Sequence, residues 1–164
     1  MHTHPPDIVN RIGKPLGRIP SGVFILTASH DGASGAMLAS WVQQAAFDPP
    51  AVSVAVAKGR PILELIRASK RLAISVVPHD DKTLMKRYAR GIKEGEDPFA
   101  GVATQKTSSG IPVLADALAW FEAEVIHACD FGGDHELLVA KVTDGAVLRE
   151  GAAFTHQRGN GFHY

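Results

Sequence analysis

The sequence predicts a mainly β protein, a small β-barrel with peripheral helices. Short runs rich in strand-forming residues recur along the chain, and Asp-Gly or Gly-Gly dipeptides that favour tight hairpins separate two pairs of them. The strands and helices do not alternate regularly, as a doubly wound parallel sheet would require. The length of 164 residues matches one domain of ordinary size. We therefore expect residues 1–164 to form a single domain.

The composition excludes several classes of function. Lysine plus arginine and aspartate plus glutamate number 17 each, so no basic excess is available to bind nucleic acid or an anionic membrane surface. The longest apolar runs are far shorter than the roughly 20 residues that span a bilayer, and the N-terminal residues lack the apolar core of a secretory signal. Cys129 is the only cysteine, which favours a reducing compartment. We expect a cytoplasmic protein with no membrane, nucleic-acid or metal site.

The chain begins with a short helix and a hairpin. Residues from Asp7 to about Leu16 show helical spacing of apolar side chains, with Asp7 as the expected cap. The strand that starts near Gly22 should turn back at Asp31-Gly32. That turn predicts three apolar cross-strand pairs: Phe24 with Ala39, Ile25 with Leu38, and Leu26 with Met37.

The middle of the chain predicts two strands, each followed by a helix. Asp48-Pro49-Pro50 precedes a buried strand from Ala51 to Lys58. Pro61 fits the first turn of a helix that ends near Ser69. A strand from Leu72 to Val77 follows, and then a short helix capped by Asp80 or Asp81.

The last third predicts an irregular stretch and a second hairpin. Residues Gly91 to Asp116 are rich in Gly and Pro, which favours a functional lid. Strands Trp120–His127 and Glu136–Thr143 should pair around a two-residue Gly132-Gly133 loop. That register places His127 opposite Leu138 and Glu124 opposite Lys141.

Three features are candidates for chemistry, each with a plainer alternative. Small residues on one face of the strand that contains Ala55 and Ala57 let a flat ligand approach the backbone, or let a helix or second subunit pack closely. Lys58-Gly59-Arg60-Pro61 at a helix start suits a phosphate, or carries ordinary solvated charges. His135 follows Gly133-Asp134. It either lies over a redox ring, where it could donate a hydrogen bond or orient a hydride donor, or is an ordinary, partly exposed turn histidine.

Four segments, taken together, resemble the flavin reductase-like family. They are Gly22–Ala28, Gly35–Gln44, Phe47-Asp48-Pro49-Pro50 and Gly133-Asp134-His135. Gly35–Gln44 is especially similar to the flavin reductase module at the carboxyl end of some multidomain flavodiiron proteins, as is the tail His156–Tyr164. We expect the module to stand alone in this chain.

The resemblance implies an FMN-binding split β-barrel of Greek-key type, usually a homodimer with the flavin near the subunit interface. Reduced nicotinamide, NAD(P)H, would reduce FMN, with FAD as the alternative flavin and free flavin or a redox partner protein as the final acceptor. His135 would lie near the nicotinamide or flavin as the catalytic residue. The cofactor-binding residues carried over by position are Met37, Leu38, Ala39, Ser40, Trp41, Ala55, Val56, Ala57, Lys58 and Arg60.

One position departs from the family pattern. Many members have a Ser-x-Thr phosphate contact after this strand, whereas this chain has Gly59-Arg60-Pro61 and lacks both hydroxyls. Arg60 can compensate because a guanidinium makes bidentate phosphate contacts. The leading function is NAD(P)H-dependent FMN reduction. The alternatives are an FMN-binding electron-transfer module without direct NAD(P)H activity and a flavin-free dimeric binding protein.

Overall fold

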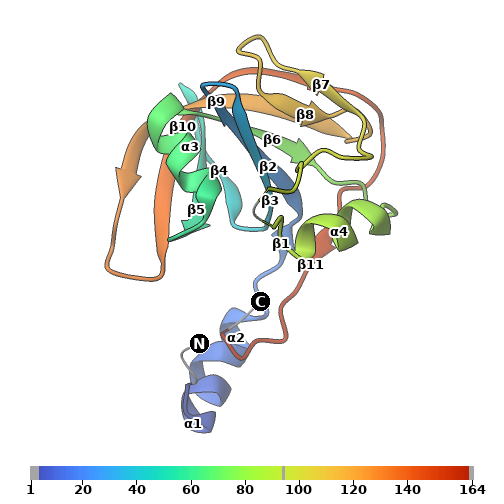
Figure 1. Ribbon diagram of the computed structural model, residues 1–164. Coiled ribbons are helices and arrows are strands. Elements are labelled where there is room, and N and C mark those ends of the chain that lie inside the picture. The colour runs from blue at the N-terminus through green and yellow to red at the C-terminus, as the bar shows by residue number, and fades with distance from the viewer. Residues whose placement is uncertain (1–3, 94, 163–164) are drawn as a thin grey trace.

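A seven-stranded antiparallel sheet forms the centre of the molecule (Figure 1). The computed structural model describes residues 4–93 and 95–162. The sheet order is β3-β2-β6-β9-β10-β5-β4, which confirms the predicted mainly β fold. Its strands are β2 (Phe24–His30), β3 (Ala33–Ala39), β4 (Val42–Phe47), β5 (Pro50–Ala57), β6 (Arg71–Val76), β9 (Ala119–Cys129) and β10 (His135–Val147).

The sheet curls into a barrel that stays split between its two edge strands. These edges, β3 and β4, are consecutive in the chain and are joined by only Ser40 and Trp41. So short a link holds the two edges close at that end, although they are not paired with each other. A further backbone bond, from Ala55 N–H to the carbonyl of Trp41 at 3.0 Å, fastens the link to β5. The split therefore places Ser40 and Trp41 between the two edges of the sheet.

Two helices cover the barrel, and both agree with the predictions. Helix α3 (Pro61–Ser69) buries Ile62, Leu63 and Ile66 against the core of the sheet. Helix α4 (Lys82–Ala89) begins at Asp81, whose carboxylate accepts hydrogen bonds from the N–H groups of Thr83 and Leu84. Such a cap satisfies N–H groups that have no partner inside the helix. Helix α4 adds Leu84 and Tyr88 to a second apolar cluster.

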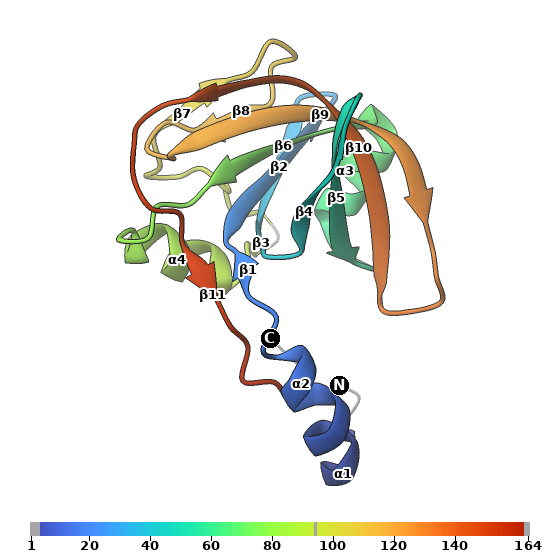
Figure 2. The same cartoon turned by 180° about the vertical axis from the view of Figure 1, so that it is seen from behind.

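The N-terminal arm extends away from the barrel beside the C-terminal tail (Figure 2). It comprises α1 (Pro6–Ile8), a π-helical segment η1 (Val9–Gly13) and α2 (Lys14–Leu16), so the helix is present. The expected cap is wrong, because Pro5 is the N-cap and Asp7 lies in the first turn. Strand β1 (Ser21–Gly22) pairs with β11 (Thr155–His156). The arm and the tail thus leave the barrel side by side.

The first hairpin has the predicted register, whereas the second does not. All three pairs expected between β2 and β3 are present. In the second hairpin Glu124 pairs with Lys141 as predicted, but His127 pairs with Val139 rather than Leu138. A bulge at Ile126 inserts one residue into β9 and shifts the register beyond it. The loop from Asp130 to Asp134 is accordingly longer than the predicted Gly132-Gly133 turn.

The stretch from Gly91 to Asp116 is only partly irregular. It contains a small hairpin of β7 (Thr104–Lys106) and β8 (Pro112–Leu114), which packs Val113 and Leu114 into the core. The interpretation of the whole stretch as a lid is therefore wrong for this half, because buried apolar side chains anchor it. None of the helices in the described ranges is long and apolar enough to cross a membrane.

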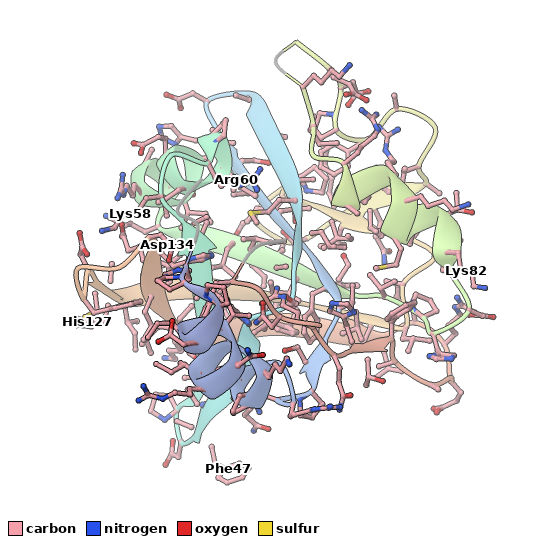
Figure 3. The ribbon with its side chains drawn as sticks, turned by 90° about the horizontal axis from the view of Figure 1, so that it is seen from below. Phe47, Lys58, Arg60, Lys82, His127 and Asp134 are labelled. Atoms are coloured by element: carbon pink, nitrogen blue, oxygen red, sulfur yellow. The ribbon has the colours of Figure 1, made fainter. Side chains whose placement is uncertain are left out.

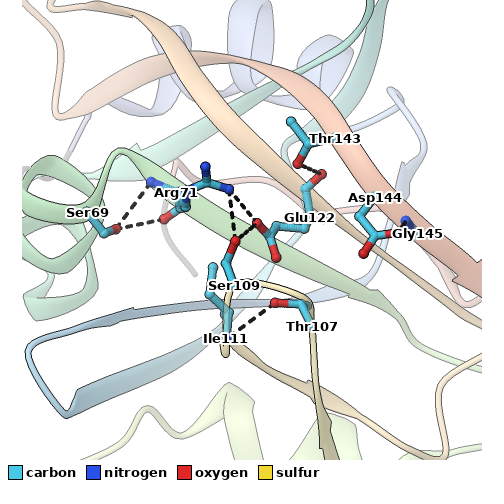
Figure 4. A network of polar contacts seen from close by, with 9 residues as sticks. All are labelled: Ser69, Arg71, Thr107, Ser109, Ile111, Glu122, Thr143, Asp144 and Gly145. Atoms are coloured by element: carbon cyan, nitrogen blue, oxygen red, sulfur yellow. Dashed lines mark hydrogen bonds and ion pairs between the residues drawn. The ribbon is translucent and has the colours of Figure 1, made fainter.

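A buried carboxylate fastens this small hairpin to the sheet (Figure 4). Glu122 of β9 is fully buried, and its Oε1 accepts hydrogen bonds from Ser109 Oγ at 2.6 Å and from Arg71 at 2.8 Å. Arg71 also donates to Ser109 Oγ at 2.9 Å. Burial alone raises the pKa of Glu122, but hydrogen bonds from Ser109, Thr107 and Arg71 outweigh it and leave the pKa below its ordinary value.

Candidate functional site

A large cavity lies between β3, the N-terminal end of α3, the segment after α4 and the C-terminal tail. Its volume is about 1330 Å³, above the 300–1,000 Å³ or so of a typical small-molecule site. From Ser34 to Ser40 it follows seven residues of extended chain, or six steps of about 3.3 Å and thus about 20 Å. Its apolar lining residues include Val23, Met37, Leu38, Ile62, Leu65, Met85 and Tyr88. An elongated ligand with an apolar part, or two ligands together, fits these dimensions.

The charged groups of the cavity are cationic. Arg60, Arg90, Lys93 and Arg158 line it, and no aspartate or glutamate is among the described lining residues. Arg90 is already engaged by Glu96, whose pKa is lowered mainly by the hydrogen bond from Arg90. The remaining positive charge favours an anionic ligand, because low-dielectric walls strengthen the attraction between unlike charges.

The predicted phosphate site is divided by the structure. Lys58 points to the loop between β9 and β10, where its ammonium lies 2.7 Å from Asp130 and lowers the pKa of that carboxyl. Arg60 instead lines the cavity as the residue before α3, and Gly59 makes the turn with φ +78°. Figure 3 shows Lys58 and Arg60 on the two sides of this turn. Arg60 is therefore the better placed of the two to meet a phosphate in the cavity.

Four of the residues predicted to contact the flavin ring and its ribityl chain line the cavity. They are Met37, Leu38, Ser40 and Ala57. Ala39 and Val56 belong to the buried core, with 6% and 0% exposure, so they offer a ligand only their backbone. In β5, alternation of side chains explains why Val56 faces the core and Ala57 the cavity. In the edge strand β3, the neighbours Met37 and Leu38 both line the cavity.

Trp41 and Ala55 line a second, shallower depression on the other side of the split. Its volume is about 220 Å³, and Ser40 is shared by the two sites. Trp41 is 44% exposed, which is high for so large an apolar ring. The link between β3 and β4 thus separates the large cavity from this depression.

His135 is buried and its ring contacts that of Trp41. Only 4% of the residue is exposed, its Nδ1 lies 2.8 Å from Asp134 Oδ1, and its ring centroid lies 4.6 Å from that of Trp41. The hydrogen bond to His135 lowers the pKa of the Asp134 carboxyl. His135 is not among the residues that line the cavity. Its direct contact with a nicotinamide stays a prediction, while the geometry favours an effect through Trp41.

Several residues that were not predicted reach the cavity from distant parts of the chain. Tyr88 and Arg90 come from the end of α4, and Arg158 from the tail. Only Arg158 had a sequence signal, because it lies in the tail segment that resembles flavodiiron modules. Within the described ranges, no group of three or more His, Cys, Asp or Glu side chains is arranged to hold a metal ion.

Comparison with known proteins identifies the family of this site. Residues 16–162 match the family model described as the flavin reductase like domain. The chain belongs to this family. It is 42% identical over 153 residues to diflavin flavoprotein A 1 of Synechocystis sp., an alignment that covers 92% of this chain and 26% of that relative. The chain thus spans about a quarter of the length of the curated relatives it matches.

Solved structures of flavin reductases share the fold. The flavin reductase PheA2 in its native state is 26% identical, with a TM-score of 0.76 over 95% of this chain and 99% of that one. The NADH:FAD oxidoreductase SgcE6 of Streptomyces globisporus is 21% identical, with a TM-score of 0.83 over 96% and 93% of the two chains. At this identity the second comparison bears on the fold alone. The predicted split barrel is confirmed.

Proposed function

We propose that this chain is an NAD(P)H-dependent FMN reductase that transfers hydride from reduced nicotinamide to FMN. The observation that carries the proposal is the large cavity, which combines an apolar lining with arginine and lysine side chains and has no carboxylate among its described lining residues. FMN has the same division into a flat ring and a phosphate. The cavity also exceeds the size usual for one small ligand, which suits a flavin and a nicotinamide bound together.

The residues present fit FMN better than a neutral ligand. Met37 and Leu38 supply apolar contact for a ring, Ala57 leaves room at the end of β5, and Arg60 supplies a cation for the phosphate. In place of the Ser-x-Thr hydroxyls the chain has a guanidinium, which can donate two parallel hydrogen bonds to a phosphate and carries a full positive charge. FAD remains the alternative flavin.

The chain's own part in the reaction is placement. FMN, when bound, supplies the electron-accepting ring. The apolar side chains of β3 and α4 exclude water from that end of the cavity, and the strand backbone near Ser40 and Ala57 orients the ring edge. Asp134 holds the imidazole of His135 through Nδ1, and His135 supports Trp41 at the split. None of these residues needs to act as a nucleophile.

We further propose that two copies associate beside the split. Ile19 and Trp41 are 61% and 44% exposed at the shallow depression, and Phe47 is 88% exposed at the other end of β4. Apolar groups that cluster on a surface mark interaction sites. Sedimentation would give the mass of the free protein and reveal a dimer.

A redox partner protein or free flavin would be the final acceptor of the electrons. The single cysteine, Cys129, fits a reducing cytoplasm.

Replacement of Arg60 by alanine should weaken FMN but spare riboflavin, which has no phosphate. Removal of a charged hydrogen bond costs about 1.5–3 kcal/mol, so we expect the Kd for FMN to rise about tenfold or more and that for riboflavin to change less than about threefold. Fluorescence titration with both ligands measures this. Equal losses for the two would show that Arg60 does not contact the phosphate.

Nicotinamide oxidation under steady-state conditions tests the function itself. We expect consumption of NADH or NADPH to depend on added FMN and to saturate with both substrates. Binding of FMN without nicotinamide oxidation would instead identify an electron-transfer module. Failure to bind any flavin would leave a flavin-free binding protein and reject the proposal.

A further inference from the structure

The C-terminal tail supplies a cation to the edge of the cavity at the split. We refer to residues 155–162 as the tail strap. Within it Arg158 is half-buried, while its neighbours Gln157 and Gly159 are exposed. Its guanidinium donates a hydrogen bond to Ser40 Oγ and lies 4.7 Å above the ring of Trp41. Arg158 thus turns a long side chain inward between exposed neighbours, and the strap is half-buried again from Asn160 to Phe162.

Successive contacts join Arg158, Trp41, His135 and Asp134. The guanidinium lies over Trp41, the imidazole of His135 contacts the same ring, and Asp134 holds that imidazole. A cation over an aromatic face is stabilised by about 0.5–2 kcal/mol, depending on desolvation. These contacts connect a residue near the C-terminus with the loop between β9 and β10, and they cross the split.

The backbone of the strap is fixed where Arg158 emerges. The pairing of β1 with β11 and the bond from Phe154 N–H to the carbonyl of Val77, at 2.9 Å, attach its start to the barrel. On the arm, a Cβ at Gly17 would overlap the carbonyl oxygen of Arg158, so the two backbones are in close contact. The backbone from which the Arg158 side chain extends is therefore held by the barrel before it and by the arm beside it.

We propose that Arg158 enables this cavity to bind reduced FMN more tightly than oxidised FMN. The inference rests on the proposed function. Oxidised FMN takes up two electrons and one proton, both supplied as hydride by the reduced nicotinamide, and the product ring carries one negative charge at neutral pH. Arg158 lines the cavity beside Ser40, at the end away from the Gly35–α3 contact, and no carboxylate lines the cavity among the described residues. A fixed cation there stabilises the charged ring but not the neutral one.

Arg60 provides the contrast that makes the inference testable. A phosphate carries its charge in both redox states, so the effect of Arg60 on affinity is the same for oxidised and reduced FMN. Arg158 acts on a charge that appears only on reduction. The ratio of the two dissociation constants therefore separates the two arginines, whereas either affinity alone does not.

The experiment measures the Kd of oxidised and dithionite-reduced FMN anaerobically, for the unmodified protein and four variants. We expect the unmodified protein to prefer reduced FMN by about tenfold or more, equivalent to about 30 mV in a two-electron potential. Arg158→Met should abolish most of this preference, and Arg158→Lys should retain it. Arg60→Gln should weaken both forms equally. Arg149→Gln, which removes an exposed arginine bonded to the Asp116 carbonyl outside the cavity, should change neither.

Two results would overturn the inference while FMN reduction stands. One is an unmodified protein that binds oxidised FMN at least as tightly as reduced FMN, a result that does not depend on any variant folding. The other is an Arg158→Met variant with normal thermal melting and an unchanged ratio. Failure of the unmodified protein to bind either form would reject the proposed function and this inference with it.

Discussion

Replacement of Ala57 by leucine is expected to raise the Kd for FMN about 100-fold. Ala57 lines the cavity at the end of β5 and is only partly buried, so the added carbons would occupy ligand space rather than core. Overfilling a packed site costs about 1–3 kcal/mol, and loss of the ring contacts adds to that cost. Titration of FMN followed by flavin fluorescence measures the change.

A matched control separates this steric effect from a change in folding. Ala128 lies in β9, is exposed and lines neither cavity. The Ala128→Leu variant should bind FMN within about threefold of the unmodified protein, and both variants should melt within a few degrees of it. Normal FMN affinity in a folded Ala57→Leu variant would show that the ring does not bind beside β5.

Replacement of Arg71 by glutamine is expected to destabilise the fold by about 3–5 kcal/mol, because it leaves the Glu122 carboxylate buried without its cation. For a chain of this length that corresponds to a fall in Tm on the order of 10 °C. Removal of Glu122 should cost less, since the side chain of Arg71 is 40% exposed and can turn to water. Thermal melting of both variants shows which of the two loses more stability. Lys106→Gln, at an exposed position of β7 in the same small hairpin, serves as the control.

The pH dependence of stability should become weaker in the Arg71→Gln variant. In the unmodified protein the lowered pKa of Glu122 gives stability that is present above the pKa of an unfolded glutamate and is lost as the pH falls through the folded value. Without Arg71, the hydrogen bonds from Ser109 and Thr107 still lower the folded pKa of Glu122 but oppose burial less completely, so the folded pKa lies closer to that of an unfolded glutamate and less stability is lost as the pH falls. Urea unfolding at several pH values tests this. The same slope in both proteins would contradict the assigned role of Arg71.

Local signals were sufficient to predict the first hairpin and both peripheral helices. Asp31-Gly32 specifies a two-residue turn, and that turn fixes every pair in β2 and β3. Asp81 and Pro61 mark helix starts by their own chemistry. The register of the second hairpin was predicted wrongly because β9 has a bulge at Ile126, just beyond Glu124, where its pairing with β6 ends. No local residue pattern indicates this bulge.

The site was only partly predictable for a similar reason. Ser40 could be found because it lies in a segment that resembles the family, and Ala57 because the family pattern carries over to its position. In β5, strand alternation then separates Ala57 from the buried Val56. Arg158 meets Ser40 across 118 residues of sequence, and Tyr88 reaches the cavity from α4. Contacts between such distant segments depend on the fold of the whole chain, so spacing within either segment cannot predict them.

Reduction of bound FMN by nicotinamide can be observed directly in a single turnover. The protein loaded with FMN is mixed anaerobically with NADH or NADPH in a stopped-flow instrument, and the visible absorption band of the flavin is followed through a single turnover. We expect the band to bleach completely, at a rate that saturates with the nicotinamide concentration. Bound FMN that keeps its colour with both nicotinamides, while dithionite bleaches it, would contradict the claim that this chain is a reductase.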